Sequence, residues 1–532
     1  MTTASAAPPT RHRERTGRFA TLVAAGILLS RIFGLIRQRF LSHYLGLGAA
    51  ADAFNAAFKI PNFLQNMFGE GVLSASFIPV YARLLAEGNE EEADRVAGAV
   101  AALLGLGVAI LVLLGVLAAP WLVDIIAGGF TGAKRDLTVN LVRILFPGAG
   151  LLVMSAWCLG VLNSHRRFFI SYTAPVVWNL AIIASLLIFG GRLGEFPLAT
   201  AAAWGAVIGS ALQLIVQLPT VSRLLTHFRP ALDVTSQNVR TVVRNFVPVF
   251  IGRGVVQVSS FVDVILASYL PTSAVAALAN AQMVAMLPVS LFGMSVSAAE
   301  LPTMSSALGE DAEVAAYLRT RLDAGLRRIA FLVVPSAVAF LTLGDVLAGA
   351  LFQTGKFTRA DTIYVWGILA GAAVGLLAST LGRLYSSTYY ALRDTRTPLR
   401  YAIVRVTLTT VLGVFFSLEV PKLIGLDAKW GAAGLTMSAG FAAWVEFTLL
   451  RRTLNGRIGA TGVPSALVAQ LWLAALVAAA GAWGVKLLVG VSHPIVLAIA
   501  ALIPFGLIYF GVTSALRVPE ARTIIGSALR RR

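Results

Sequence analysis

Charged side chains stand inside stretches of this sequence that are otherwise apolar, and they are its best candidates for chemistry. Arg31 and Arg37 lie in one apolar run near the N-terminus, and Arg253 lies in another. A charge at the centre of a membrane costs about 2.5–3.5 kcal/mol on insertion scales, so it usually faces a cavity, a ligand or a partner. We therefore expect Arg31 and Arg37 to contact a ligand, with pairing to a carboxylate on a neighbouring helix as the alternative.

Three carboxylates, Glu70, Asp263 and Glu300, also lie within apolar runs and are candidates for gating or coupling. For Asp263 and Glu300 a structural ion pair with Arg253 or Arg405 is the competing interpretation. Ser30 belongs to a stripe of small residues that also contains Gly26 and Gly34. Such a stripe permits close helix packing or approach of the backbone to a ligand.

Patterns typical of nucleotide-binding loops, nucleophile elbows and zinc sites are missing from the sequence, so we expect no enzyme activity. The single cysteine, Cys158, excludes a disulfide within the chain, and five scattered histidines exclude a metal centre rich in histidine. The net charge of +18 does not indicate nucleic-acid binding, because the cations occur in short clusters between apolar runs.

These residues need helices to hold them in place. The chain has 532 residues, of which 57% are hydrophobic and 13% charged, and its mean hydropathy is +0.80. Apolar runs of about 18 residues or more can cross a membrane. They predict an all-α polytopic membrane protein of about fourteen transmembrane helices, near residues 19–44, 52–83, 95–119, 138–162, 168–190, 197–222, 242–270, 273–307, 325–346, 361–391, 399–418, 431–451, 465–486 and 494–516.

The connections between these helices differ in charge. Lys and Arg number 27 in the two tails and alternate connections, against 8 in the other connections. Cytoplasmic segments carry the excess of cations, so both termini are predicted to be cytoplasmic. Residues 1–18 are expected to form a disordered basic tail.

Helices 1–6 and 7–12 resemble two copies of one unit. Ser30-Arg31 recurs as Gly252-Arg253 with an offset of 222, Phe68-Gly69 recurs as Phe292-Gly293 with an offset of 224, and Pro79 recurs as Pro302 with an offset of 223. Six helices per copy preserve the orientation, which predicts parallel repeats as two lobes around a central cavity. The expected divisions are a tail (1–18), an N-lobe (19–222), a C-lobe (223–457) and two extra helices with a basic C-tail (458–532).

Several blocks resemble the MurJ/MviN family of lipid II flippases. The most specific are Ser30–Arg37 (SRIFGLIR), Ala51–Leu64 (ADAFNAAFKIPNFL) and Phe68–Pro79 (FGEGVLSASFIP). Leu351–Thr358 (LFQTGKFT) and Asp394–Pro398 (DTRTP) resemble two family loops. The resemblance covers roughly residues 20–450 and implies a bacterial inner-membrane protein that carries lipid II outward by alternating access.

The resemblance also assigns roles to residues. It implies that Arg31 and Arg37 bind the pyrophosphate and that Asp263 is a candidate sodium ligand. Asp52, Asn62 and Glu70 match family positions of functional weight, so we expect Asn62, with Ser30, to face the substrate and Asp52 and Glu70 to act in gating or coupling. Two positions where the family usually has arginine are Gln65 and Met283 here. We expect Arg253, the repeat equivalent of Arg31, to replace the two missing arginines. Gln65 is still expected to contact the substrate.

The predicted function is therefore a lipid II flippase. The alternatives are a flippase for another polyprenyl-pyrophosphate-linked saccharide and a transport-inactive scaffold for cell-wall synthesis. The expected partners are the glycolipid, membrane lipids and cell-wall synthesis proteins, without nucleic acid. No organic cofactor is expected. Transport could be coupled to a cation, either sodium or a proton.

Overall fold

The computed structural model describes the backbone of residues 10–233, 235–307, 309–489 and 493–522. Side chains are described for all of these except residues 10–25, 27, 70, 251–256 and 258–260. Every regular element in the described ranges is helical, which agrees with the requirement that backbone groups in lipid satisfy their own hydrogen bonds. The chain divides into two compact units, Met1–Ile265 and Leu266–Arg532. The predicted lobes divide earlier, at residue 222, and those boundaries stay a prediction.

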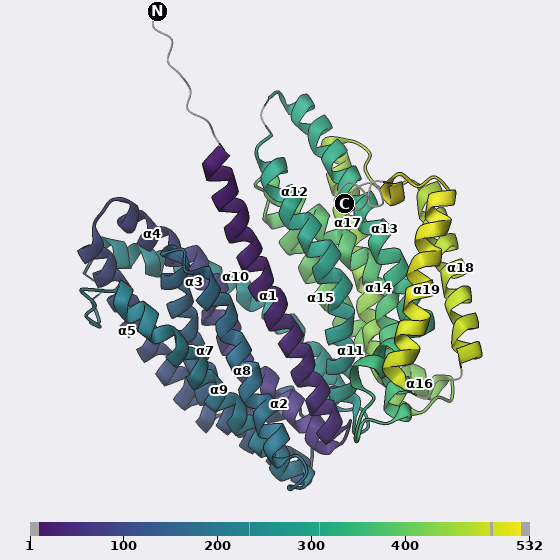
Figure 1. Cartoon of the computed structure of the whole chain (residues 1–532), viewed down its shortest axis with the longest axis horizontal. Coiled ribbons are helices and arrows are strands. Elements are labelled where there is room, and N and C mark those ends of the chain that lie inside the picture. Colours follow the sequence, from purple (N-terminus) through teal and green to yellow (C-terminus); the bar gives the residue numbers. More distant parts are fainter. Residues whose placement is uncertain (1–9, 234, 308, 490–492, 523–532) are drawn as a thin grey trace, which may run out of the picture. The chain divides into compact units, whose positions relative to one another are not determined.

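Unit 1 is formed by the helices up to α10, the last of which crosses into unit 2 (Figure 1). Their bounds are α1 (Thr10–Leu45), α2 (Ala49–Phe68), α3 (Glu70–Ser76), α4 (Ile78–Ala86), α5 (Glu90–Leu117), α6 (Ala119–Ile126), α7 (Gly132–Ser164), α8 (Phe168–Phe189), α9 (Glu195–Leu224) and α10 (Gln237–Ser268).

The helix predicted over residues 52–83 is divided into α2, α3 and α4. Gly69 separates the first two, with an extended backbone at φ −80° and ψ −157°. A Cβ atom at Gly69 would lie 2.2 Å from the carbonyl oxygen of Gln65, so only glycine fits this break. Hydropathy does not detect such a break because it is averaged over many residues and does not register the backbone conformation of a single glycine.

Two other predictions need correction at helix ends. α1 begins at Thr10, so residues 10–18 are helical where a disordered tail was expected, and residues 1–9 lie outside the described part. The reason is that four of these nine residues are arginine, which favours helix. α6 was not predicted, because its eight residues are too few to cross a membrane.

α7 lies at the centre of unit 1, where it contacts α2, α5 and α9. Its residues Cys158, Val161 and Leu162 are fully buried against Phe77 and Tyr81, which follow the α3–α4 break. The Tyr81 hydroxyl lies 2.9 Å from Nε2 of His165. This packing fixes α7 beside the broken end of α2.

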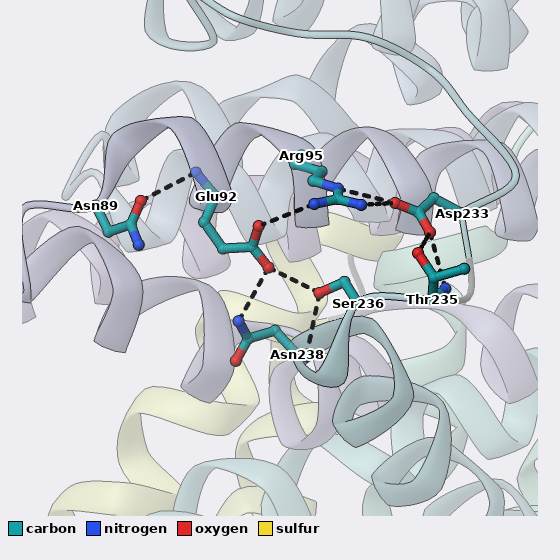
Figure 2. Close-up of polar contacts among 7 residues, drawn as sticks. All are labelled: Asn89, Glu92, Arg95, Asp233, Thr235, Ser236 and Asn238. Atoms are coloured by element: carbon teal, nitrogen blue, oxygen red, sulfur yellow. Dashed lines mark hydrogen bonds and ion pairs between the residues drawn. The ribbon is translucent and has the colours of Figure 1, made fainter.

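Polar contacts attach the segment that joins α9 to α10 to the start of α5 (Figure 2). Nε of Arg95 donates to Asp233 at 2.8 Å, and the Ser236 hydroxyl donates to Glu92 at 2.7 Å. The hydroxyl and backbone N–H of Thr235, together with Arg95, hold the pKa of the Asp233 carboxyl well below its usual range. The start of α10 is therefore anchored to the body of unit 1.

Unit 2 contains the remaining helices, including two π-helical segments, η1 and η2. Their bounds are α11 (Ala274–Pro288), η1 (Val289–Met294), α12 (Ser295–Ser305), α13 (Asp311–Phe352), α14 (Arg359–Ala391), α15 (Arg396–Val414), η2 (Phe415–Glu419), α16 (Val420–Leu423), η3 (Ala428–Trp430), α17 (Gly431–Ile458), α18 (Ser465–Val489) and α19 (Pro494–Ala515).

α14 packs closely against α13 and α17 and forms the core of unit 2. A Cβ atom at Gly375 would lie 2.3 Å from the Cα atom of Gly440 on α17. The backbones of α14 and α17 can approach this closely because both positions are glycine.

α18 and α19 lie side by side and contact α13 (Figure 1). Nζ of Lys486 on α18 lies 2.8 Å from the buried carboxylate of Asp345 on α13, and Arg359 lies 2.7 Å from the same carboxylate. The Tyr509 hydroxyl of α19 donates to the carbonyl of Phe331 at 2.6 Å. These two helices, outside the predicted repeat, are thus part of unit 2.

Eleven helical segments in the described residues are long and apolar enough to cross a membrane. Three further helices of 20 residues or more, α1, α2 and α10, lie outside this set. The chain is therefore a multi-pass helical membrane protein, and the number fourteen stays a prediction.

Candidate functional site

Arg37 of α1 lies against two aromatic rings in unit 1. Its Cζ atom is 5.3 Å from the ring centroid of Phe58 on α2 and 5.1 Å from that of Trp178 on α8. The two rings stack on each other with centroids 5.6 Å apart. We call Phe58 and Trp178 the aromatic cradle. It stabilises a cation through the negative faces of the rings without neutralising the charge.

Among the described side chains, Arg37 forms no ion pair with a carboxylate. Its Nε atom is buried and has no hydrogen-bond partner in the structure. A buried charge without a counter-ion is costly, and cation–π contacts supply only part of the compensation. Arg37 is therefore a cation with unused hydrogen-bonding capacity, suited to an anion.

Arg31 and Ser30 lie in different surroundings from Arg37. Arg31 is exposed and Ser30 is half-buried, and six residues of helix separate the two arginines by about 9 Å and about 120° of rotation. The small-residue stripe is used in part for packing, because a Cβ at Gly26 would meet Tyr172 at 2.6 Å whereas Gly34 faces open space. The structure brings Arg37, and not Arg31, to the cradle.

Asn62 lies beside the cradle, where it lines a small cavity of about 20 Å³ together with Phe58, Pro61 and Trp178. Gln65 lies one turn further along α2 and lines a larger cavity of about 440 Å³. We call the larger cavity the polar pocket. It is lined by Gln65, Asn66, Gly71, Ser74, Leu152, Ser155, Ala156, Leu159, Pro175 and Gln213.

Asp52, a predicted gating or coupling residue, is 1% exposed at the start of α2. Nζ of Lys134 on α7 donates to its carboxylate at 2.6 Å and lies 3.9 Å from the ring centroid of Phe130. Opposite charges therefore neutralise each other between α2 and α7. This pair gives Asp52 a structural role, and its role in coupling stays a prediction.

Asp263, the sodium candidate, interacts electrostatically with Lys59 of α2. No group of three or more His, Cys, Asp or Glu side chains suited to a metal ion is found in the described part of the chain. The side chains of Arg253 and Glu70 lie outside the described residues, so the predicted compensation by Arg253 stays a prediction.

Glu300 of α12 is 6% exposed and lies 2.7 Å from Arg321 of α13. The alternative partners expected from the sequence were Arg253 and Arg405, but Arg405 lies 3.1 Å from Glu446 instead. Glu300 therefore joins α12 to α13 within unit 2. The difference arises because α13 extends to Asp311, beyond the range 325–346 that hydropathy predicted.

The sequence analysis missed Phe58, Trp178, Ser155 and Gln213. Aromatic residues in an apolar helix normally indicate core packing, so the cradle had no signal of its own. Gln213 and Gln217 did carry one, because two amides four residues apart in an apolar helix share one face. That spacing could have indicated a polar surface inside the membrane.

The family model and the curated relatives that match this chain have the same description. A family model described as "Lipid II flippase MurJ" matches residues 41–504. The chain is similar to the lipid II flippase MurJ of Burkholderia cenocepacia, at 31% identity over 82% of this chain and 84% of that protein. It is also similar to a probable lipid II flippase MurJ of Bdellovibrio bacteriovorus, at 32% identity over 83% of each chain.

Solved structures show the same fold. A structure titled "Lipid II flippase MurJ, inward closed conformation" matches 93% of this chain and 98% of its own, with a TM-score of 0.76 and 22% identity. An inward-facing multidrug resistance MATE family transporter of the MOP superfamily matches 82% of this chain and 98% of its own, with a TM-score of 0.62 and 16% identity. At these identities the likeness concerns the fold alone.

Proposed function

The chain belongs to the lipid II flippase MurJ family, and we propose that it carries lipid II from the inner to the outer leaflet of the bacterial cytoplasmic membrane. The substrate is a polyprenyl pyrophosphate that bears a sugar and peptide headgroup. Moving its charges unaided through hydrocarbon would cost tens of kcal/mol by Born arguments. The protein's task is therefore to lower this barrier by binding the headgroup, which makes it a transporter and not an enzyme.

The observation that carries this proposal is the environment of Arg37. The aromatic cradle keeps the guanidinium in place while leaving it without a carboxylate among the described side chains. Guanidinium groups bind phosphate oxygens through paired N–H donors. Arg37 is thus prepared to bind the pyrophosphate and to release it again, because no permanent counter-ion competes. Arg31, one and a half turns away on α1, adds a second cation.

The architecture that we propose has fourteen spans in two lobes related by a parallel repeat, with both termini cytoplasmic. The eleven apolar segments together with α1, α2 and α10 support this number. Irregular backbone at equivalent repeat positions supports the two copies, since α2 ends before Gly69 and η1 contains Gly293. Broken helices of this kind permit the bending that alternating access requires.

The driving force belongs to the same proposal. An inside-negative membrane potential favours outward movement of an anion by about 2.3 kcal/mol per charge per 100 mV. A coupling cation, sodium or a proton, would act through Asp263 and through Asp52, Glu70 or Glu300. Arg253 would supply a cation from the second copy of the repeat.

The test is outward movement of lipid II by Arg37 variants, measured in cells depleted of their own flippase and in liposomes that contain the purified protein. Arg37→Ala should reduce translocation about ten- to hundredfold, the value of a charge-assisted contact. Arg37→Lys should retain part of the activity, because it keeps the charge but loses the planar fork. Arg192→Ala, at an exposed position between α8 and α9, is the matched control and should behave like the unaltered chain.

The same measurement separates the alternatives. A flippase for a different polyprenyl-pyrophosphate saccharide would translocate that lipid and leave lipid II in place. A transport-inactive scaffold would move neither lipid while supporting wall synthesis through its partners. Full lipid II translocation by Arg37→Ala would contradict the role that we give to Arg37.

A further inference from the structure

The polar pocket is formed within unit 1 by five helices and is separate from the aromatic cradle. Gln65 and Asn66 come from α2, Ser74 from α3, Ser155 from α7 and Gln213 from α9, and Pro175 of α8 completes the wall. Its volume of about 440 Å³ falls within the range of pockets that bind small molecules. None of the described residues that line it is charged, whereas charged side chains line a larger cavity in unit 2.

Two of the lining side chains, Ser155 and Gln213, belong to a buried hydrogen-bond network of uncharged groups. Nε2 of Gln213 donates to the Ser155 hydroxyl at 2.9 Å, and that hydroxyl donates to Oε1 of Gln217 at 3.2 Å. All three side chains are less than 9% exposed. Nε2 of Gln217 is buried and has no hydrogen-bond partner. A buried polar group without a partner is costly in an apolar surrounding, so the network keeps one unused donor directly behind Ser155.

The near wall is formed by the break between α2 and α3. α2 ends at Phe68, one turn after Gln65, and α3 begins at Glu70. Gln65 and Asn66 before the break and Gly71 and Ser74 after it line the pocket. Asn66 also donates to Gln257 of α10 at 3.3 Å. Apolar atoms of Leu152, Leu159 and Pro175 cover the remaining surface.

This composition matches a sugar better than a phosphate. Hydroxyl and amide groups need neutral donors and acceptors, and the carbon faces of a sugar ring need apolar contacts. An anion needs cations, and among the side chains that the structure describes none lines the pocket. Neutral amides and hydroxyls beside an apolar wall therefore favour an N-acetylated sugar.

The position of the pocket agrees with this assignment. Leu152 lines both the polar pocket and the small cavity beside Asn62. Asn62 and Gln65 are three residues apart on α2, a rise of about 4.5 Å. A group attached directly to a pyrophosphate at Arg37 would therefore reach the pocket without a long spacer.

We propose that the polar pocket binds the N-acetylated sugar that is attached to the pyrophosphate of the substrate, through Gln213, Ser155 and Gln65. This inference rests on the proposed function and adds to it a sugar subsite. Arg37 binds the charged part, and the pocket distinguishes lipids that bear the sugar from lipids that lack it.

The test compares two lipids that differ only in the sugar. The purified full-length protein is titrated with undecaprenyl pyrophosphate and with undecaprenyl-pyrophosphoryl-N-acetylglucosamine, and the dissociation constants are measured. Gln213→Met keeps the length of the side chain and removes its amide. It should weaken binding of the sugar-bearing lipid about five- to twentyfold and change binding of the other lipid by less than about twofold.

Two further variants make the comparison decisive. Ser155→Ala removes the central hydroxyl and should give the same selective loss of affinity for the sugar-bearing lipid. It replaces Gln213→Met in the comparison if that variant does not fold. Ser185→Ala is the matched control, because its hydroxyl is buried in the same unit but donates only to Ile182 of its own helix, and it should leave both constants unchanged. Arg37→Ala should weaken both lipids equally.

The outcomes separate this inference from the proposed function. Equal weakening of both lipids by Gln213→Met and Ser155→Ala, or no weakening of either, overturns the sugar subsite while the flippase function stands. Equal affinity of the unaltered protein for the two lipids has the same consequence. If the unaltered protein binds neither lipid but translocates lipid II, the subsite falls and the flippase function stands. If it also fails to translocate lipid II, both fall.

Discussion

At the scale of single residues, the buried charges of this protein fall into two groups. Asp52 and Asp345 each have a lysine within 2.8 Å on another helix, so their charge is neutralised within one unit. Arg37 has aromatic faces in place of a carboxylate among the described side chains. The first group joins helices together, whereas the second offers a charge to a ligand. This difference assigns a ligand role to Arg37 and a structural role to the pairs.

The pair formed by Asp52 and Lys134 can be tested as a double-mutant cycle. Asp52→Asn and Lys134→Met should each lower the free energy of unfolding by about 3 kcal/mol, because each leaves a charge uncompensated. The double variant should be destabilised by less than the sum, since both charges are gone. Thermal unfolding of the purified protein measures all three. Additive effects, or lost transport at unchanged stability for Asp52→Asn, would favour coupling over structure.

At the scale of elements, both units contain a long helical segment that is interrupted. α2 stops at Phe68 and α3 starts at Glu70, and residues on both sides of that break line the polar pocket. In unit 2, α11 passes into the π-helical segment η1 directly after Pro288. π-Helical turns and proline interrupt the regular hydrogen-bond ladder of a helix and permit bending. Both breaks occur at the Phe-Gly pairs that recur in the sequence.

Gly69 provides a direct test of the first break. Gly69→Ala should destabilise the protein by about 1–3 kcal/mol, because its Cβ atom would overlap the carbonyl oxygen of Gln65. Gly107→Ala on α5 is the control, since no atom lies within 4 Å of the added Cβ. In a helix this second change should be neutral or stabilising by up to about 1 kcal/mol. Similar unfolding midpoints for the two variants would show that the break tolerates a side chain.

At the scale of the whole molecule, the distribution of cations predicts how the chain lies in the membrane. The connection before α14 belongs to the cation-poor set, and the connection before α5 belongs to the cation-rich set. A cytoplasmic position for the second set also places the cation-rich termini inside. The orientation determines which side of unit 1 the substrate reaches first.

Cysteine labelling in intact cells tests this orientation. A Lys356→Cys variant, at an exposed position before α14, should react with an impermeant thiol reagent. Glu91→Cys, exposed at the start of α5, should react only after the cells are opened. The unaltered chain is the control, because its one cysteine, Cys158, is fully buried and should not react. The opposite pattern at the two positions would reverse the proposed topology.

The sequence by itself determined the helical, membrane-spanning character of this protein and the bounds of several of its helices. The predicted range 168–190 agrees with α8 at Phe168–Phe189, and 494–516 agrees with α19 at Pro494–Ala515. Such segments are predictable because insertion depends on hydropathy summed over adjacent residues, and each helix satisfies its own backbone. The motifs that resemble the family are also stretches of adjacent residues, so the sequence alone is sufficient to indicate the family.

Only the tertiary structure decided which charges are paired and which are available. Asp52 meets Lys134 across 82 positions, and Asp345 meets Lys486 across 141. The aromatic cradle and the polar pocket likewise take side chains from helices far apart in the chain. Contacts of this kind depend on how helices pack and in which direction each side chain points, and neither is encoded by local hydropathy. For this reason the sequence identified Arg37 as a candidate, whereas the packing of α1, α2 and α8 determined its surroundings.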